Sequence, residues 1–282
     1  MTNIDSKLVG KLRDMTGAAL MDCKRALQEA NGDLEAAVDI LRKKGLKNAD
    51  KRAGRKAGAG RVHSIVSPDG RRGAMVLMTS ETDFVPPTDD FKSLLERITQ
   101  VAYHKRIGNA SALLEQTLEG APVAEALKAL TGKCGENVEA PSVACFEVAK
   151  GAVGGYIHHD MKTAGFAAIS TGASAAVAQE FLKELGMHIV FSRPQALERS
   201  QIPAEAVERE RAVYAESDEV KSKPEDRRAK IVEGKLEKFF AGLALLEQPW
   251  FKDDKTTVRK KLTEALGADA KVEGFALFVV GA

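Results

Sequence analysis

The hydrophobic pattern changes its period partway along the chain, and this change constrains the fold more than any other feature. Residues 6–45 repeat apolar side chains at helical spacing, with breaks at Thr16-Gly17 and Asn31-Gly32. From Val62 onward apolar and polar residues alternate, and Ser67-Pro68-Asp69-Gly70 supplies a turn, as in a β-hairpin. The chain therefore combines helices and strands, and because no regular strand–helix–strand repeat follows, we predict an α+β fold.

The N-terminal 50 residues are predicted to form a small domain of three helices. Asp33 can cap the third helix, and Gly45, which follows Lys43-Lys44, is expected to end it. The apolar positions of the three helices are Leu8, Val9 and Leu12, then Cys23, Ala26, Leu27 and Ala30, then Leu34, Ala37, Val38 and Leu41. A unit of about 40 residues buries a small fraction of its surface, so it is marginal by itself.

A basic segment follows this domain. Residues 42–61 contain nine Lys and Arg residues and a single acid, Asp50. Glycines in its second half favour an extended, solvated linker at 51–61. The alternative is an RNA- or ribosome-associated protein that neutralises phosphates with these residues. Because the segment has no aromatic side chain to stack on bases, we favour the linker and expect no direct nucleic-acid binding.

The remaining elements are predicted from periodicity and from capping residues. Helices are expected from Thr88 or Asp89 to about Arg106 and at 112–118, 123–130 and 175–191, and strands at 62–66, 74–78, 143–149, 156–157, 166–170 and 272–279. Near 203–246, Lys223-Pro224 reverses a charged helix that carries Val207 and Tyr214. The return helix has an apolar seam of Val232, Leu236, Phe239, Leu243 and Leu246, whose spacings of 4, 3, 4 and 3 predict an antiparallel helical hairpin.

Composition excludes several classes of protein. No apolar run approaches the ~18 residues that span a bilayer, and the N-terminus has no secretory signal pattern, so we expect no membrane contact. Cys23, Cys134 and Cys145 are too widely spaced for a disulfide framework or a zinc site, which favours the cytoplasm. The net charge of +2 conceals a basic N-terminal part, +6 over residues 1–61, and a core of −4.

Catalytic motifs are absent from the sequence. Gly132-Lys133 lacks the rest of a P-loop, and no Gly-rich dinucleotide fingerprint follows a strand. His158-His159-Asp160 suggests a metal, but adjacent residues on a strand point to opposite faces, so we expect an ordinary surface turn. We therefore expect a protein that is not an enzyme, with no catalytic residue, cofactor or metal.

One polar connection carries an unexpected aromatic residue. Thr82-Asp83-Phe84-Val85 contains the first of the chain's 15 aromatic residues and is followed by Pro86-Pro87. Phe84 could pack under the following helix beside Phe91. Alternatively, the prolines restrict the loop and lower the entropy cost of presenting Phe84 to a partner. The residues alone leave both interpretations open.

Several motifs together resemble the bacterial elongation factor Ts family. The N-terminal signature is Leu12-Arg13-Asp14-Met15-Thr16-Gly17-Ala18 with Met21-Asp22-Cys23-Lys24-Arg25-Ala26-Leu27 and Gly32-Asp33, and the second signature is Thr82-Asp83-Phe84-Val85. Further matches are Gly135-Glu136-Asn137, Gly155-Tyr156 before His158, Met187-His188-Ile189 ahead of Pro194, and Val232-Glu233-Gly234 with Lys238-Phe239. They occur in the family's order over nearly the whole chain, which makes the combination specific.

This resemblance implies a domain layout. A ubiquitin-associated-like helical domain would occupy 1–50 and the basic linker 51–61, followed by a two-part α+β core with antiparallel sheets. The first core subdomain would be 62–140, and the second would be 141–200 with 247–282, separated by the helical hairpin, a coiled coil, at 201–246. The sequence has no extra C-terminal helical module after Gly281-Ala282, so contacts of such a module are expected to be absent.

The resemblance also implies a function, namely guanine nucleotide exchange on the translational GTPase elongation factor Tu. Thr82, Asp83, Phe84 and Val85 would enter the GTP-binding domain of that partner and disturb its Mg²⁺ site. Further partner contacts would be Arg13, Leu20, Met21, Lys24, Cys134, Gly135 and His158, although Leu20 and Met21 could equally be core residues of the small domain. A homodimer, or a complex of two copies of each chain, through the hairpin is left open.

Three positions depart from the family's pattern. Ser80 stands where Cys is usual, and Pro86-Pro87 replace small or polar residues. The turn after His158, at 159–164, is longer than in the family, which bears directly on the role of His158.

Overall fold

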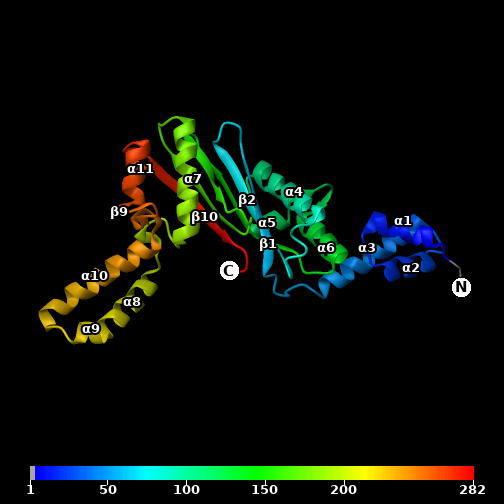
Figure 1. Cartoon of the computed structure of the whole chain (residues 1–282), viewed down its shortest axis with the longest axis horizontal. Coiled ribbons are helices and arrows are strands. Elements are labelled where there is room, and N and C mark those ends of the chain that lie inside the picture. Colours follow the sequence, from blue (N-terminus) through cyan, green and yellow to red (C-terminus); the bar gives the residue numbers. More distant parts are fainter. Residues whose placement is uncertain (1–3) are drawn as a thin grey trace. The chain divides into compact units, whose positions relative to one another are not determined.

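A computed structural model describes residues 4–282, apart from the side chains of residues 46–48. Two compact units are formed (Figure 1). The first contains the residues up to Ile65 together with Ala74–Cys145 and Val279–Ala282, and the second contains Val66–Gly73 and Phe146–Phe278. The mixture of helices and antiparallel sheets confirms the α+β class.

The first unit begins with three helices around a small apolar core. They are α1 (Ser6–Thr16), α2 (Leu20–Glu29) and α3 (Leu34–Asp50). Asp33 caps α3 as predicted, since its carboxylate accepts the backbone N–H groups of Glu35 and Ala36 at 2.9 and 3.1 Å. The buried residues of this core are Val9, Leu12, Cys23, Ala26, Leu27 and Ala37.

Helix α3 does not stop at Gly45, and that prediction was wrong. The helix continues to Asp50, and Gly45 lies within it against another glycine, Gly132 of helix α6 (Val123–Cys134). A Cβ atom at Gly132 would lie 2.8 Å from the Gly45 backbone, so Gly132 accepts no side chain without displacement, whereas a Cβ at Gly45 would lie 3.4 Å from the nearest atom of Gly132. Gly45 therefore serves a close helix crossing rather than a helix end.

A three-stranded sheet follows in the first unit, with the strand order β1-β2-β5. Its strands are β1 (Ala59–Val66), β2 (Arg72–Ser80) and β5 (Glu139–Glu147). The predicted hairpin is confirmed, because Ser67 N–H donates to Arg72 O at 2.7 Å across the turn. The other elements of this unit are α4 (Asp89–Lys105), α5 (Ala110–Leu114), β3 (Thr117–Leu118) and β4 (Ala121–Pro122). Phe91, Leu95 and Ile98 of α4 are among the most deeply buried side chains of its core.

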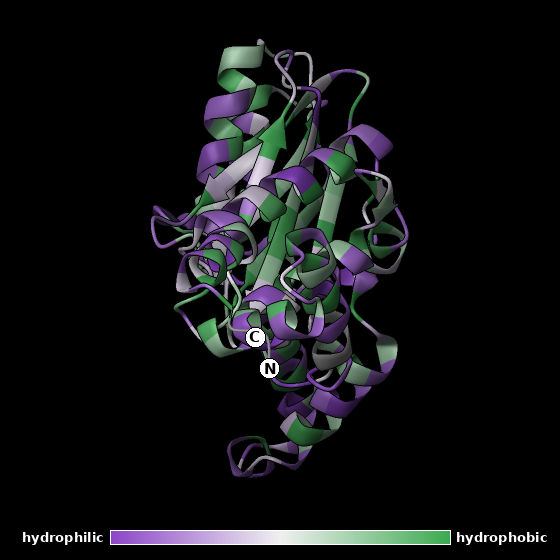
Figure 2. Ribbon diagram, turned by 90° about the vertical axis from the view of Figure 1, so that its right-hand side faces the viewer, coloured by the Kyte–Doolittle hydropathy of each residue, from purple (hydrophilic) through white to green (hydrophobic). Residues whose placement is uncertain are grey.

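The second unit is built on a sheet with the order β10-β7-β6. Its strands are β6 (Gly151–Ile157), β7 (Thr163–Ser170) and β10 (Lys271–Val279), and helix α7 (Ala175–Ser192) packs against it. Strands are coloured mostly as hydrophobic in Figure 2, whereas helices mix hydrophobic and hydrophilic residues. A Cβ at Gly186 of α7 would lie 2.4 Å from Tyr156 N, so the helix needs glycine there to approach β6. Short elements complete this core: β8 (Pro249–Trp250), β9 (Asp253–Thr257) and α11 (Val258–Leu266).

The predicted helical hairpin consists of α8 (Ala204–Glu216), the short α9 (Asp218–Lys221) and α10 (Glu225–Leu243). Val232 and Leu236 are buried, with Val207, Tyr214 and Phe239 packed against them. The predicted seam is wrong at its last residue. Leu246 lies beyond the helix, in a 3₁₀ turn at Leu245–Glu247, and packs into the core of the second unit.

Candidate functional site

The candidate site is the connection between β2 and α4, where the sequence places Thr82-Asp83-Phe84-Val85. Ser80 at the end of β2 is fully buried, and its hydroxyl donates to Thr82 O at 2.8 Å. Val85 is buried in the core of the first unit. Thr88 donates to Val85 O at 2.7 Å and accepts Phe91 N–H at 3.4 Å, which starts α4. The segment is therefore anchored on both sides of Phe84.

Phe84 is 81% exposed, the largest exposed fraction among the large apolar side chains described. The interpretation that it packs beside Phe91 is wrong, because Phe91 is fully buried and Val85 supplies the apolar anchor of the segment. Asp83 is also exposed. A carboxylate and a phenyl ring are thus presented together on a short, anchored connection, an arrangement suited to contact with another molecule.

Glu136 binds this segment from the turn that follows α6. Its carboxylate accepts the Thr82 N–H at 2.9 Å and the Thr82 hydroxyl at 2.6 Å. The neighbouring residues form a reciprocal contact, since Glu81 accepts the Asn137 N–H at 2.8 Å. We predicted partner contacts for Cys134 and Gly135, which directly precede Glu136, but no role for Glu136 itself. Its place in Gly135-Glu136-Asn137 was the available sequence signal.

Two arginines of the basic segment 42–61 are paired with a carboxylate of the connection between β2 and α4. Arg52 and Arg55 lie 3.8 and 3.6 Å from the Glu81 carboxylate, and Asn137 Nδ2 donates to Arg55 O at 2.9 Å. Residues 59–61 already belong to β1. The predicted solvated linker at 51–61 is therefore wrong at 59–61, which are part of a strand, and two of its arginines contact Glu81.

Cys134 and Gly135 lie directly before Glu136. Gly135 ends α6 in the left-handed conformation, with φ 76°, and its N–H donates to Thr131 O. The Cys134 thiol lies 3.6 Å from Glu136 O, and burial raises the pKa of this thiol. A thiol with a raised pKa is a poor nucleophile, which argues against a catalytic role for Cys134. The left-handed conformation of Gly135 and the Cys134–Glu136 contact instead shape the turn that contacts Thr82.

The predicted N-terminal contacts are all exposed. Leu20 and Met21 open α2 with 51% and 61% of their surfaces accessible, so the alternative that they belong to the small core is wrong. Arg13 and Lys24 are exposed as well. Met15, at 58%, is a further exposed apolar residue that the helical pattern gave no reason to single out.

His158 belongs to the second unit, so the structure does not bring it into one compact unit with the other predicted residues. Strand β6 ends at Ile157, which places His158 and His159 in the turn with their ring centroids 4.2 Å apart. The argument from opposite strand faces therefore does not apply to this pair. His158 Nδ1 lies 3.1 Å from the Asp160 carboxylate, and within residues 4–282 no group of three metal-binding side chains is found.

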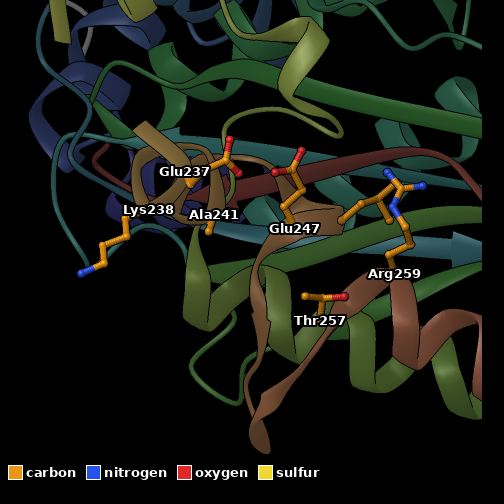
Figure 3. A pocket seen from close by; sticks show the side chains of 7 residues that line it. Glu237, Lys238, Ala241, Glu247, Thr257 and Arg259 are labelled. Carbon is orange, nitrogen blue, oxygen red and sulfur yellow. The ribbon is translucent and has the colours of Figure 1, made fainter. Parts of the chain in front are cut away.

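A surface pocket of about 440 Å³ lies at the base of the hairpin (Figure 3). It is lined by Glu237, Lys238, Ala241, Leu246, Glu247, Thr257 and Arg259. Both glutamates bind Arg199, and Arg259 binds Glu198 at 3.0 Å. Because these charges are engaged within the chain, the pocket offers few groups to a ligand.

None of the helices in the described part of the chain is long and apolar enough to cross a membrane.

Residues 81–282 match the family model described as elongation factor TS. The chain is 38% identical over 278 residues to elongation factor Ts of Thioalkalivibrio sulfidiphilus, covering 99% of this chain and 92% of that protein. It is also 38% identical over 287 residues to elongation factor Ts of Brucella ovis, covering 99% and 93%. The chain belongs to the elongation factor Ts family.

Proposed function

We propose that the protein is a guanine nucleotide exchange factor for elongation factor Tu and promotes GDP release during protein synthesis in the cytoplasm. The exposed Phe84 ring on its anchored connection is the observation that carries this proposal. An apolar ring held ready in water gains free energy when it enters a pocket of a partner, and the anchoring reduces the entropy lost on binding.

The proposed mechanism acts on the Mg²⁺ ion that the partner shares with GDP. Magnesium requires near-ideal octahedral geometry and tolerates little displacement of its ligands. Phe84, wedged into the GTP-binding domain with Asp83 beside it, would shift a group that holds the ion. The phosphates of GDP would then be poorly neutralised, and GDP would leave faster. No covalent bond is made or broken, so the protein is not an enzyme in this scheme.

Release of the factor follows from thermodynamic reciprocity. If the factor weakens nucleotide binding, the nucleotide weakens binding of the factor by the same ratio. Incoming GTP therefore displaces the factor and completes the exchange.

The other exposed residues would extend the contact. Arg13, Leu20, Met21 and Lys24 provide an apolar surface with cationic neighbours, which suits an interface whose apolar centre has a polar rim. Cys134 and Gly135 would contribute through the turn beside Thr82, and we assign His158 a separate contact from the second unit.

The hairpin enters this proposal only as the place of a predicted self-association. Its apolar seam is used for packing within the chain, and the homodimer or two-by-two complex stays a prediction. Light scattering of a variant lacking 203–246 tests it, since an unchanged subunit number would remove the hairpin from dimerisation.

The deciding experiment measures release of labelled GDP from elongation factor Tu with and without the protein. We expect release to accelerate with increasing protein until the partner is saturated. Unchanged release in the presence of folded protein that binds the partner would overturn the proposal.

A further inference from the structure

We propose that Glu136 is a positioning residue that fixes the Phe84 ring for its partner. This inference rests on the proposed exchange function. It assigns a role to a side chain that the proposed mechanism does not place in contact with elongation factor Tu. The residue acts through hydrogen bonds to the backbone and hydroxyl of Thr82.

The route from Glu136 to Phe84 is continuous. One carboxylate oxygen accepts the Thr82 N–H, and the other accepts the Thr82 hydroxyl proton. The same hydroxyl oxygen accepts the Phe84 N–H at 3.4 Å. Glu136 therefore fixes Thr82, and Thr82 in turn binds the backbone N–H of Phe84, whose ring is exposed. Hydrogen bonds to an ionised acceptor are stronger than neutral ones, which suits a contact that must hold at the surface.

Reciprocal bonding reinforces this arrangement. Glu136 accepts a backbone N–H from Thr82, while the residue before Thr82, Glu81, accepts the N–H of Asn137, the residue after Glu136. Two chain segments more than fifty positions apart are thus joined through two carboxylates. Arg52 and Arg55 beside Glu81 reduce the repulsion that two neighbouring negative charges would produce.

The rest of the segment leaves the N–H and hydroxyl of Thr82 to Glu136. Ser80 and Val85 fix the ends of the connection through burial, and the Ser80 hydroxyl binds Thr82 O, but Thr82, Asp83 and Phe84 are exposed. Without the carboxylate, these three residues would regain backbone freedom, and binding would have to order them again.

The first test needs no partner protein. In Glu136→Ala, we expect the amide hydrogens of Thr82 and Phe84 to exchange with solvent at least tenfold faster, while those of Val76 and Met78 in β2 keep their rates. Glu125→Ala, which removes an exposed carboxylate from the first turn of α6, is the control and should leave all four rates unchanged. Unchanged exchange at Thr82 in Glu136→Ala would overturn the proposal.

The second test separates positioning from direct contact. We expect Glu136→Ala to slow factor-stimulated GDP release at least fivefold in the wild-type background and less than 1.5-fold in the Phe84→Ala background. Glu136→Gln, which keeps one acceptor oxygen, should restore part of the rate, and Thr82→Val should match Glu136→Ala. An equal loss in both backgrounds would overturn a role through Phe84. If wild-type protein fails to accelerate release, the exchange function falls, and the amide measurement still decides whether Glu136 orders the segment.

Discussion

The Phe84 segment and the base of the helical hairpin are each held by two carboxylates, but the carboxylates have different partners. In the segment, Glu81 and Glu136 accept backbone N–H groups. At the hairpin base, Glu247 accepts Arg199 Nε–H at 2.8 Å, and Glu237 accepts another Arg199 N–H at 3.0 Å.

The nearby aromatic rings show what this difference means. The Arg199 guanidinium lies 4.7 Å from the centre of the Phe240 ring and covers it, whereas Phe84 is 81% exposed. At the hairpin base, the Arg199 guanidinium is paired with two carboxylates and packs on the Phe240 ring. In the Phe84 segment, the backbone N–H groups of Thr82 and Phe84 are hydrogen-bonded, but the Phe84 ring is exposed. We infer that the hairpin base is built for stability and the segment for contact, and the predictions below test that division.

The largest effect on stability is expected from Leu236→Ala in α10. Leu236 is fully buried in the hairpin, so its truncation should lower the free energy of unfolding by about 2–5 kcal/mol. Urea unfolding followed by far-ultraviolet circular dichroism measures this change. Val213→Ala on α8, where the side chain is 56% exposed, is the control, with an expected change below about 0.5 kcal/mol. Equal effects of the two substitutions would contradict the packing described for the hairpin.

The largest effect on function is expected from Phe84→Ala. Stimulated GDP release should slow at least tenfold, about 1.4 kcal/mol of transition-state stabilisation. Because the ring is exposed, the free energy of unfolding should change by less than about 0.5 kcal/mol. Phe191→Ala is a matched control, since Phe191 is 75% exposed at the end of α7 and lies outside the candidate site. A similar loss of exchange in both variants would remove the special role of Phe84.

A smaller effect is expected from Arg199→Lys. Lysine keeps the charge but cannot bind two carboxylates with a planar fork, so unfolding should become easier by about 1 kcal/mol. Arg211→Lys is the control, because Arg211 also pairs within the hairpin, with Glu233 and Glu208, but away from its base. Thermal unfolding should show a larger decrease for Arg199→Lys. A larger decrease for Arg211→Lys would argue that the pairing of Arg199 with Glu237 and Glu247 is not the main contact that stabilises the hairpin base.

The last expected effect is a pH dependence of the free energy of unfolding at the hairpin base. Buried His188 bonds Gln248 Oε1 through Nε2 at 2.9 Å, and its Nδ1 accepts the Phe251 N–H at 3.3 Å, which requires the neutral ring. Gln248 in turn donates to Gly242 O of α10 at 2.8 Å. Burial lowers the pKa of His188 below its ordinary value of 6.5.

Below pH 6.5 the unfolded chain therefore binds a proton that the folded chain does not. This contribution to stability is complete above pH 6.5 and decreases as the pH falls below it, by at most about 1.4 kcal/mol per pH unit for one group. Urea unfolding between neutral and mildly acidic pH measures the slope. His188→Gln should reduce the slope, and His159→Gln, at an exposed position, should retain it. A slope that His188→Gln leaves unchanged would assign the effect to other groups.

Much of the fold could be predicted from local patterns. The caps at Asp33 and Thr88, the hairpin turn at 67–70 and the pairing of the two charged helices depend on residues close together in the sequence. Errors arose where a distant segment decided the outcome. Gly45 has the sequence context of a helix end, but in the structure it lies within the helix against Gly132. Leu246 continues the heptad spacing in the sequence, but it packs into the core of the second unit instead of the hairpin seam.

The candidate site shows the same division. The sequence alone determined that an aromatic residue stands beside a carboxylate in a polar connection, and its motifs determined the family resemblance. Whether the ring is buried or exposed depended on which neighbour, Val85 or Phe84, fills the core, and whether the connection is ordered depended on Glu136, far along the chain. Local sequence fixes the types and spacing of the chemical groups, but only the tertiary structure decides which of them pair, because burial and hydrogen bonding are completed by distant residues.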